Sequence, residues 1–486
     1  MKLILSKTKI FLALAMAAIL MPTLVGCSGQ SLEKEVKQTL LKGDTTEARF
    51  AELCEFVERS GERSLLDANG EADVALVGEY INGVGARLRP ARQWNVGAYG
   101  IKQLLLSVYL ERSGSMTPYD TQGGGGELKK AVNDLINFFP SDGVEPSIFI
   151  VNDGVYAYDG QVAEFLKDKN IYASTANVGN ASHTDFGEIF STILEKQQPN
   201  EVSVLITDMI YSPKNTKNVS AEKIFNEENS LATSVFKQYP EKSVLVSKLS
   251  GTYQGKYYPY NQTSFAYNGI RPFYIFVIAD KKVVDKMTGD AAYARFVNVA
   301  NAEHFYRFNQ PEMPVDVSIL PNWEGSKGRY RIAREEGLMV EKCEGDRVTG
   351  MLQFSIAANL SVLGKDEDFL CDASNYEVAS AGGYQVSVAP IVASQVSGNN
   401  KSYLEGKTHI ITISGMPEVR KDEVVIKIKN DFPQWICQSN ATDDTDAGAA
   451  GFENTTFGIE PFLKGIYDAY VNVGDAYATI RIKIEK

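Results

Sequence analysis

The 486-residue sequence lacks the short signatures by which many enzymes are recognised. Its three histidines, His183, His304 and His409, are scattered, and neither an H-E-x-x-H metal motif nor a G-x-S-x-G nucleophile motif occurs. The glycine run Gly123–Gly126 is not followed by the Lys-Ser/Thr pair of a phosphate-binding loop, so we interpret it as an ordinary loop. We therefore do not expect an enzyme.

Cysteine and positive charge are both scarce. No two of the five cysteines have C-x-x-C spacing, which argues against a zinc site or a redox motif and leaves open a disulfide among Cys343, Cys371 and Cys437. The formal charge is −12, and residues 1–26 hold three lysines and no acid, so the remainder has 46 basic against 61 acidic side chains, or −15. Such a surface repels phosphate backbones, so no nucleic-acid partner is expected.

Residues 1–26 have the pattern of a secretory signal peptide. A basic start precedes an apolar run at Ile10–Leu24, which is too short and too interrupted for a comfortable membrane span. The run ends in Leu-Val-Gly-Cys, which resembles the lipobox of bacterial lipoproteins. The resemblance implies cleavage before Cys27 and a lipid anchor on that residue, and Ser28 after it implies the outer membrane. The alternative is an ordinary signal peptide with a chance cysteine.

The rest of the chain divides into three regions by its hydrophobic pattern. Residues 27–97 show helical spacing and carry no evident chemistry. Residues 98–300 alternate apolar runs with amphipathic helices, which predicts an α/β domain with a largely parallel sheet and a tight hairpin turn at Asn152–Gly154. Residues 305–486 switch to a period of two, which predicts one or two β-sandwich modules interrupted by a helix near Glu460–Val473.

Oxygen-bearing side chains follow two buried strands of the α/β region. Leu104–Leu110 runs into Glu111, after which Ser113 and Ser115 occupy alternating positions. The strand Val202–Thr207 runs into Asp208, and in between Thr184 stands just before a predicted helix. Ligands of open α/β sheets lie beyond the carboxyl ends of the strands, so these side chains should converge on one crevice if the two strands are neighbours. Oxygen donors of this kind suit Mg²⁺.

The three motifs, in this order, resemble the metal-ion-dependent adhesion site of von Willebrand factor A domains, whose first motif is D-x-S-x-S. The resemblance covers residues 98–300 and implies an open sheet with helices on both faces. It also implies a bound Mg²⁺, with Mn²⁺ or Ca²⁺ as alternatives, whose coordination a ligand carboxylate completes. Two departures stand out: Glu111 replaces the first aspartate of the family, and Met209 follows Asp208 where glycine is common. By resemblance, the cation ligands would be Glu111, Ser113, Ser115, Thr184 and Asp208.

Each motif also has an explanation without a metal. Thr184 or Asp185 could cap a helix, with Glu188 completing a capping box, and the two serines could be turn residues. The site would then be degenerate and bind no cofactor. The acidic cluster Asp443, Asp444 and Asp446 lacks the continuation of an EF-hand, so an acidic loop is favoured over a calcium site.

A tyrosine-rich stretch separates the last two predicted strands of the α/β region. Exposed tyrosines are common at binding surfaces, so Tyr253, Tyr257, Tyr258 and Tyr260 are candidates for partner contacts. The alternative is a β-hairpin that packs its own rings.

Three functional hypotheses follow. The first is an envelope lipoprotein whose α/β domain binds Mg²⁺ and captures a protein or another acidic ligand. The second is a structural scaffold of an envelope assembly with a degenerate site. The third and weakest is a metal-dependent hydrolase built on Glu111 and Asp208, which has no evident general base.

Overall fold

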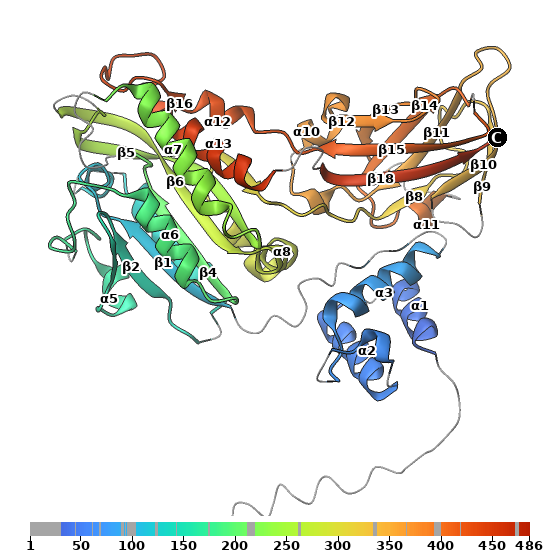
Figure 1. Cartoon of the computed structure of the whole chain (residues 1–486), viewed down its shortest axis with the longest axis horizontal. Helices are drawn as coiled ribbons and strands as arrows, with labels where there is room; N and C mark the ends of the chain where they lie inside the picture. The colour runs from blue at the N-terminus through green and yellow to red at the C-terminus, as the bar shows by residue number, and fades with distance from the viewer. Residues whose placement is uncertain are drawn as a thin grey trace, which may run out of the picture.

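The structure is a computed structural model that describes residues 31–486 except 44, 61, 68–69, 89–91, 93, 95–103, 122–124, 142, 174, 211–218, 261–263, 334–337, 366, 393–399, 418 and 472–475 (Figure 1). The predicted signal peptide, residues 1–26, and the predicted lipidation site Cys27 lie outside these residues. Within them, no helix is both long and apolar enough to cross a bilayer.

The predicted helical region forms a small bundle with its own core. Its elements are α1 (Leu32–Lys42), α2 (Glu47–Ser60), η1 (Arg63–Leu65) and α3 (Val74–Ala86). The Ser31 side chain caps α1, and apolar residues at helical spacing pack inward with Trp94, among them Val36, Leu53 and Ile81. Burial of these side chains holds the three helices together.

The α/β region is built on one seven-stranded sheet. Its strands are β1 (Leu105–Glu111), β2 (Ser147–Val151), β3 (Val155–Ala157), β4 (Glu201–Thr207), β5 (Lys242–Tyr257), β6 (Phe265–Asp280) and β7 (His304–Phe308), in the order β3-β2-β1-β4-β6-β5-β7. β1 is parallel to both β2 and β4, and the turn at Asn152–Gly154 joins β2 to antiparallel β3, as predicted.

The prediction of a largely parallel sheet is wrong for the other half. β5 and β6 form one long hairpin of two 16-residue strands, and β6 inserts antiparallel beside β4. The tyrosine-rich stretch is therefore the outer half of this hairpin, which is the alternative considered from the sequence.

Helices cover both faces of the sheet (Figure 1). One face is covered by α6 (Phe186–Lys196), α7 (Ala221–Phe236) and α13 (Ile459–Tyr470). The other is covered by α4 (Glu127–Phe138), α5 (Val162–Lys167), α8 (Lys281–Gly289) and α9 (Ala294–Val297), with η2 (Thr117–Asp120) and η3 (Ala291–Tyr293) in the connections. The domain is thus a three-layer α/β structure, as predicted.

The C-terminal strands form two further sheets that share an apolar core. The five-stranded sheet has the order β12-β15-β18-β10-β9 and the four-stranded sheet the order β13-β14-β11-β8. Their strands are β8 (Val317–Ile319), β9 (Arg329–Ile332), β10 (Met339–Glu344), β11 (Leu352–Ala358), β12 (Tyr376–Ala379), β13 (Gln385–Pro390), β14 (His409–Gly415), β15 (Lys421–Lys429) and β18 (Ala476–Glu485). The connections contain η4 (Ser361–Leu363), α10 (Glu367–Cys371), η5 (Ala373–Asn375) and α11 (Lys401–Leu404).

The predicted boundary between residues 98–300 and 305–486 does not match the packing. β7 pairs with β5 in the α/β sheet, and the chain between β15 and β18 returns to the α/β domain. This returning segment contains α12 (Gln434–Gln438), β16 (Asn440–Ala441), η8 (Phe452–Asn454), β17 (Thr456–Phe457) and α13. α13 packs on α7, and the Phe462 ring lies 5.3 Å from that of Phe190.

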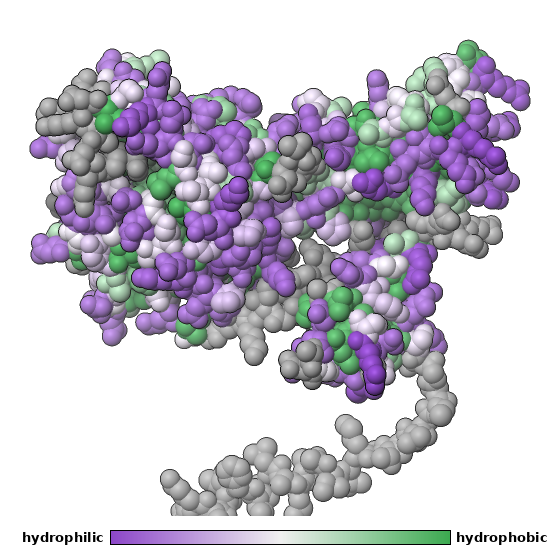
Figure 2. Space-filling view, viewed as in Figure 1, coloured by the Kyte–Doolittle hydropathy of each residue, from purple (hydrophilic) through white to green (hydrophobic). Residues whose placement is uncertain are grey.

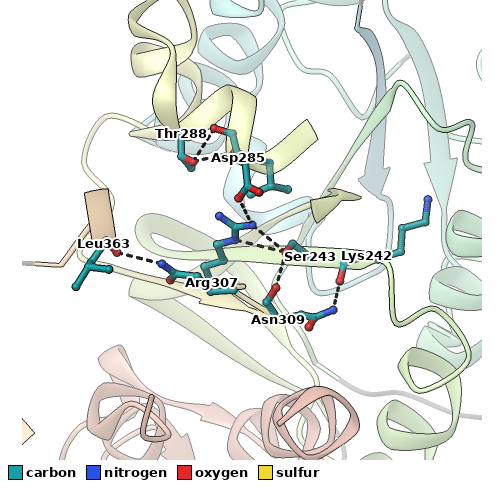
Figure 3. Close-up of polar contacts among 9 residues, drawn as sticks. Lys242, Ser243, Asp285, Thr288, Arg307, Asn309 and Leu363 are labelled. Carbon is teal, nitrogen blue, oxygen red and sulfur yellow. Dashed lines mark hydrogen bonds and ion pairs between the residues drawn. The ribbon is translucent and has the colours of Figure 1, made fainter. Parts of the chain in front are cut away.

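A buried arginine fixes β7 to the domain just before the chain enters the sandwich (Figure 3). Arg307 pairs with Asp285 of α8 at 2.7 Å and donates to the Ser243 hydroxyl of β5 at 3.2 Å. Ser243 in turn donates to the carbonyl of Asn309 at 2.8 Å. Because a buried guanidinium needs such partners, these contacts fix where the chain leaves the sheet.

Figure 2 shows hydrophilic side chains over most of the visible described surface, with apolar residues scattered among them. Cys343, Cys371 and Cys437 are free thiols, so the disulfide considered from the sequence is not formed.

Candidate functional site

The pairing of β1 with β4 places two of the predicted motifs at the same edge of the sheet. Leu110 lies opposite Ile206 in the parallel register, so Glu111 and Thr207 end their strands side by side at the carboxyl edge of the sheet. The loop after β1 is held by two backbone bonds, from Arg112 N to Val151 O at 2.8 Å and from Gly114 N to Ala181 O at 2.9 Å. The strand ends thus bring the predicted motifs together.

Glu111 is the centre of the side-chain network. Its carboxylate is fully buried, and Thr184 Oγ1 donates to Oε1 at 2.7 Å. The Thr207 hydroxyl donates to the other oxygen, Oε2. Both carboxylate oxygens therefore have a hydroxyl partner, one of which, Thr207, was not predicted.

The two serines lie together on the loop beside this carboxylate. Ser113 Oγ and Ser115 Oγ are 2.9 Å apart, and the Met116 amide donates to Ser113 Oγ at 3.2 Å. Both side chains are buried, with 4% and 5% exposure. Their alternation along the loop places both hydroxyls on the same side, as the motif predicted.

Asp208 is the second acid of the site. Its Oδ1 accepts the Ile210 amide at 3.0 Å, and its buried Oδ2 accepts no hydrogen bond from the described residues, although the nearby Ser115 hydroxyl lowers the pKa of Asp208. Burial, followed by the charge of Asp208, raises the pKa of Glu111, and burial likewise raises the pKa of Asp208. The interaction between these two buried acids therefore favours either a bound proton or a bound cation at the site.

The residue after Asp208 adopts the conformation for which glycine is usually required. Met209 has φ 56°, in the left-handed region, and its side chain is buried. Its amide donates to Thr207 Oγ1 at 2.8 Å, which orients that hydroxyl toward Glu111. The loop therefore keeps a glycine-like backbone despite the methionine.

Two further residues hold the backbone of the site through side-chain hydrogen bonds. Asn152, at the hairpin turn, is fully buried and donates from Nδ2 to Val178 O at 2.9 Å and Arg112 O at 3.3 Å. Tyr172 donates from its hydroxyl to the Glu111 carbonyl at 3.0 Å. The sequence marked Asn152 as a turn residue, but it held no signal for these long-range bonds.

Asp185 and Thr184, which are neighbours in sequence, have different roles in the structure. Asp185 is the N-cap of α6, and its Oδ1 accepts the Glu188 amide at 3.1 Å. Thr184 points instead to Glu111. The capping alternative therefore explains Asp185 and leaves Thr184 available to the site.

The donor set fits a hard divalent cation. All five candidate donors are oxygens, with the unpartnered Asp208 Oδ2 among them. Mg²⁺ is bound by oxygen ligands and usually retains water, so few carboxylates suffice. Among the described residues, no three His, Cys, Asp or Glu side chains gather into a metal site, which excludes a site built from those residue types alone.

The candidate tyrosines have different environments. Tyr253 and Tyr257 are fully buried, so the prediction that they form an exposed binding surface is wrong: inward-facing positions of the hairpin place their rings in the core. Tyr260 is partly buried, and its ring stacks on Phe457 at 4.3 Å. Tyr258 is 40% exposed.

The acidic cluster uses its carboxylates within the fold. Asp444 is buried and accepts from the Tyr257 hydroxyl at 2.8 Å and the Tyr260 amide at 3.2 Å. Asp443 accepts from Thr445, and Asp446 accepts the Gly448 amide at 2.8 Å. These contacts fit the acidic-loop interpretation.

Comparison with protein-family models, curated proteins and solved structures found no match to this chain. The resemblance to von Willebrand factor A domains therefore depends on the motifs and on the contacts among their side chains. The fold itself is a mixed α/β sheet with appended, mostly antiparallel sheets.

Proposed function

We propose that this protein is a lipid-anchored envelope protein whose von Willebrand A-like domain binds Mg²⁺ and thereby captures an acidic ligand or protein. The observation that carries the proposal is the contact network that links Glu111, Thr184 and Thr207, beside which lie the paired serine hydroxyls and the unpartnered Asp208 Oδ2. The lipid anchor is inferred from the sequence up to Cys27 alone.

The candidate ligands would contribute to cation binding in two ways. Asp208 Oδ2 and Glu111 would supply negative charge, and Ser113, Ser115 and Thr184 would supply neutral oxygens. A bound Mg²⁺ acts as an electrophile that attracts an additional oxygen ligand. The two carboxylates balance the charge of the ion, and the five candidate side chains leave one of its six octahedral positions open, which an oxygen of a partner carboxylate can fill.

A second function is favoured by the burial of the site. All five candidate ligands are 5% exposed or less, and both oxygens of Glu111 already have hydroxyl partners. This arrangement also suits a scaffold protein in which the hydroxyl network replaces the metal and other surfaces bind the partners.

Thermal unfolding with and without Mg²⁺ tests the proposal. A free-metal concentration about one hundred times the dissociation constant should stabilise the domain by about 2.7 kcal/mol. The Asp208→Ala variant should lose this stabilisation, whereas Asp443→Ala, which removes an exposed acid that is not a candidate ligand, should keep it.

Two results would contradict metal binding at this site: no Mg²⁺ effect on the wild type, or an equal effect on the Asp208→Ala variant. Partner capture from envelope extracts, with and without chelator, then separates the two functions. Loss of captured protein on chelation supports Mg²⁺-dependent binding, and identical capture supports the scaffold.

A further inference from the structure

An exposed tyrosine lies directly over the serine loop. A methyl group placed on Gly114, between Ser113 and Ser115, would lie 3.2 Å from Cε2 and 3.3 Å from Cζ of Tyr258. These distances place the Tyr258 ring against the backbone that carries both serine hydroxyls. The ring is 40% exposed while the serines beneath it are almost fully buried. Tyr258 therefore covers the backbone between the two serines.

A single buried carboxylate holds the chain on both sides of Tyr258. Asp444, which comes from the returning segment, accepts from the Tyr257 hydroxyl through Oδ2 and from the Tyr260 amide through Oδ1. Arg271, also buried, donates to the Tyr257 hydroxyl at 3.2 Å. With its neighbours tied to one acid, Tyr258 has little freedom to move independently of the hairpin.

Aromatic contacts also hold this segment: the Tyr257 ring lies 5.0 Å from that of Phe452. The Tyr260 ring stacks on Phe457 with an interplanar angle of 7°, which fixes this side of the hairpin tip to the returning segment. Removal of the Asp444 carboxylate would break two bonds at once and leave one buried donor and one part-buried donor without their acceptor. The position of Tyr258 thus depends on Asp444.

We propose that Tyr258 is a gate over the candidate cation site and that Asp444 is the positioning residue that keeps the gate closed. The gate concerns the site of the proposed function and depends on it for the identity of the ligand. A cation or a partner carboxylate that approaches from the serine side must displace the Tyr258 ring from Gly114. Because the barrier is a side-chain contact and not a coordinating atom, the gate controls rates more than equilibrium affinity.

Hydrogen exchange of the metal-free protein tests the gate without any ligand. The amides of Gly114 and Met116 are bonded to Ala181 O and Ser113 Oγ beneath the ring. Their peptide should exchange about tenfold faster in the Tyr258→Ala variant, because the loop loses its cover. Tyr258→Phe should exchange like the wild type, since the ring and not the hydroxyl covers Gly114.

Terbium provides the matching test with a bound cation. Tb³⁺ prefers oxygen ligands, and its release into excess Mg²⁺ and chelator can be followed by its luminescence. Tyr258→Ala should accelerate both binding and release about tenfold and change the dissociation constant by less than about threefold. Asp444→Asn should accelerate both to a smaller extent. Tyr156→Ala, at a tyrosine 37% exposed that contacts other glycines, should behave like the wild type.

The outcomes separate the gate from the proposed function. Unchanged exchange of the serine-loop peptide in Tyr258→Ala overturns the gate, whether or not the protein binds metal. Unchanged Tb³⁺ kinetics in that variant overturn it as well. If the wild type binds neither Tb³⁺ nor Mg²⁺ while exchange rises in Tyr258→Ala, the metal function fails and the cover over the loop stands.

Discussion

The extra methylene of Glu111 explains why this carboxylate contacts its neighbours directly. An aspartate at this position would end about 1.5 Å nearer the strand, one carbon–carbon bond short of Thr184 and Thr207. Glu111 instead reaches both hydroxyls and accepts from each. The longer side chain of glutamate therefore places the carboxylate between the two hydroxyls and links the ends of β1 and β4 to the loop before α6.

Met209 offers a test of backbone strain at the site. A left-handed backbone costs a residue with a side chain about 1–2 kcal/mol, whereas glycine adopts it freely. Both Met209→Ala and Met209→Gly lose the packing of a buried side chain, which costs about 2–5 kcal/mol, but only the glycine variant relieves the strain. We expect the glycine variant to be more stable than the alanine variant by about 1 kcal/mol in urea unfolding.

Met116 is the matched control for that order. It is equally buried and lies in the same region, but its φ of −79° carries no such strain. Here the alanine variant should be the more stable one. The same order at both positions would show that φ at Met209 stores no strain.

The sequence predicted part of the site for a clear physical reason. Glu111, Ser113, Ser115 and Asp208 follow strands whose apolar runs are readable, so their place at the sheet edge could be inferred. Thr207, Asn152 and Tyr172 act through bonds to residues far away in sequence, and no local pattern encodes such partners.

At the scale of elements, the same limit applies to strand direction. The apolar runs of β5 and β6 were predicted as strands. Such a run indicates neither the strand with which it pairs nor whether the pairing is parallel or antiparallel. The insertion of β6 between β4 and β5 follows from the hairpin, whose outer half looked like a separate tyrosine-rich insertion. In the same way, α13 was predicted as a helix but its packing on α7 was not.

Gly465 tests that packing. A Cβ at this position of α13 would lie 2.5 Å from the carbonyl oxygen of Asn229 in α7. Alanine is the better helix former by about 1 kcal/mol, but the clash with a backbone atom should cost about 1–3 kcal/mol and push the helices apart. We therefore expect Gly465→Ala to lower the urea midpoint of the α/β domain.

Gly289, at the end of α8 on the opposite face, is the control. A Cβ there meets nothing within 4 Å, so Gly289→Ala should stabilise the same domain by about 0.5–1 kcal/mol. Stabilisation by Gly465→Ala as well would contradict the close approach of α13 and α7.

At the scale of the whole molecule, the α/β domain and the sandwich share an apolar cluster and a segment of chain. The apolar cluster beneath α6, α7 and α13 continues through Tyr306, Phe308 and Met313 into the core between the two C-terminal sheets. The returning segment is also tied down by Lys248, which donates to Ser439 Oγ at 2.9 Å and Asn454 O at 2.7 Å. The segment between the sandwich strands β15 and β18 thus packs on the α/β domain and completes the domain that carries the candidate site.

Replacement of residues 430–475 by an Asn-Gly turn should separate these roles. Lys429 and Ala476 are the terminal partners of the β15–β18 ladder, next to a register shift at Ile428, so a tight turn can join the two strands there. The sandwich keeps all its strands, whereas the α/β domain loses buried apolar residues of α13 that contribute about 1.5–3 kcal/mol each, among them Ile459, Phe462, Leu463 and Ile466. Hydrogen exchange should therefore stay slow in β11 and β14, which serve as the internal control, and become fast in α7 and in the outer half of the β5–β6 hairpin.

Two outcomes would contradict this expectation. Equal loss of protection in β11 and β14 would mean that residues 430–475 belong to the folding unit of the sandwich. Unchanged protection in α7 would mean that the α/β domain does not depend on those residues.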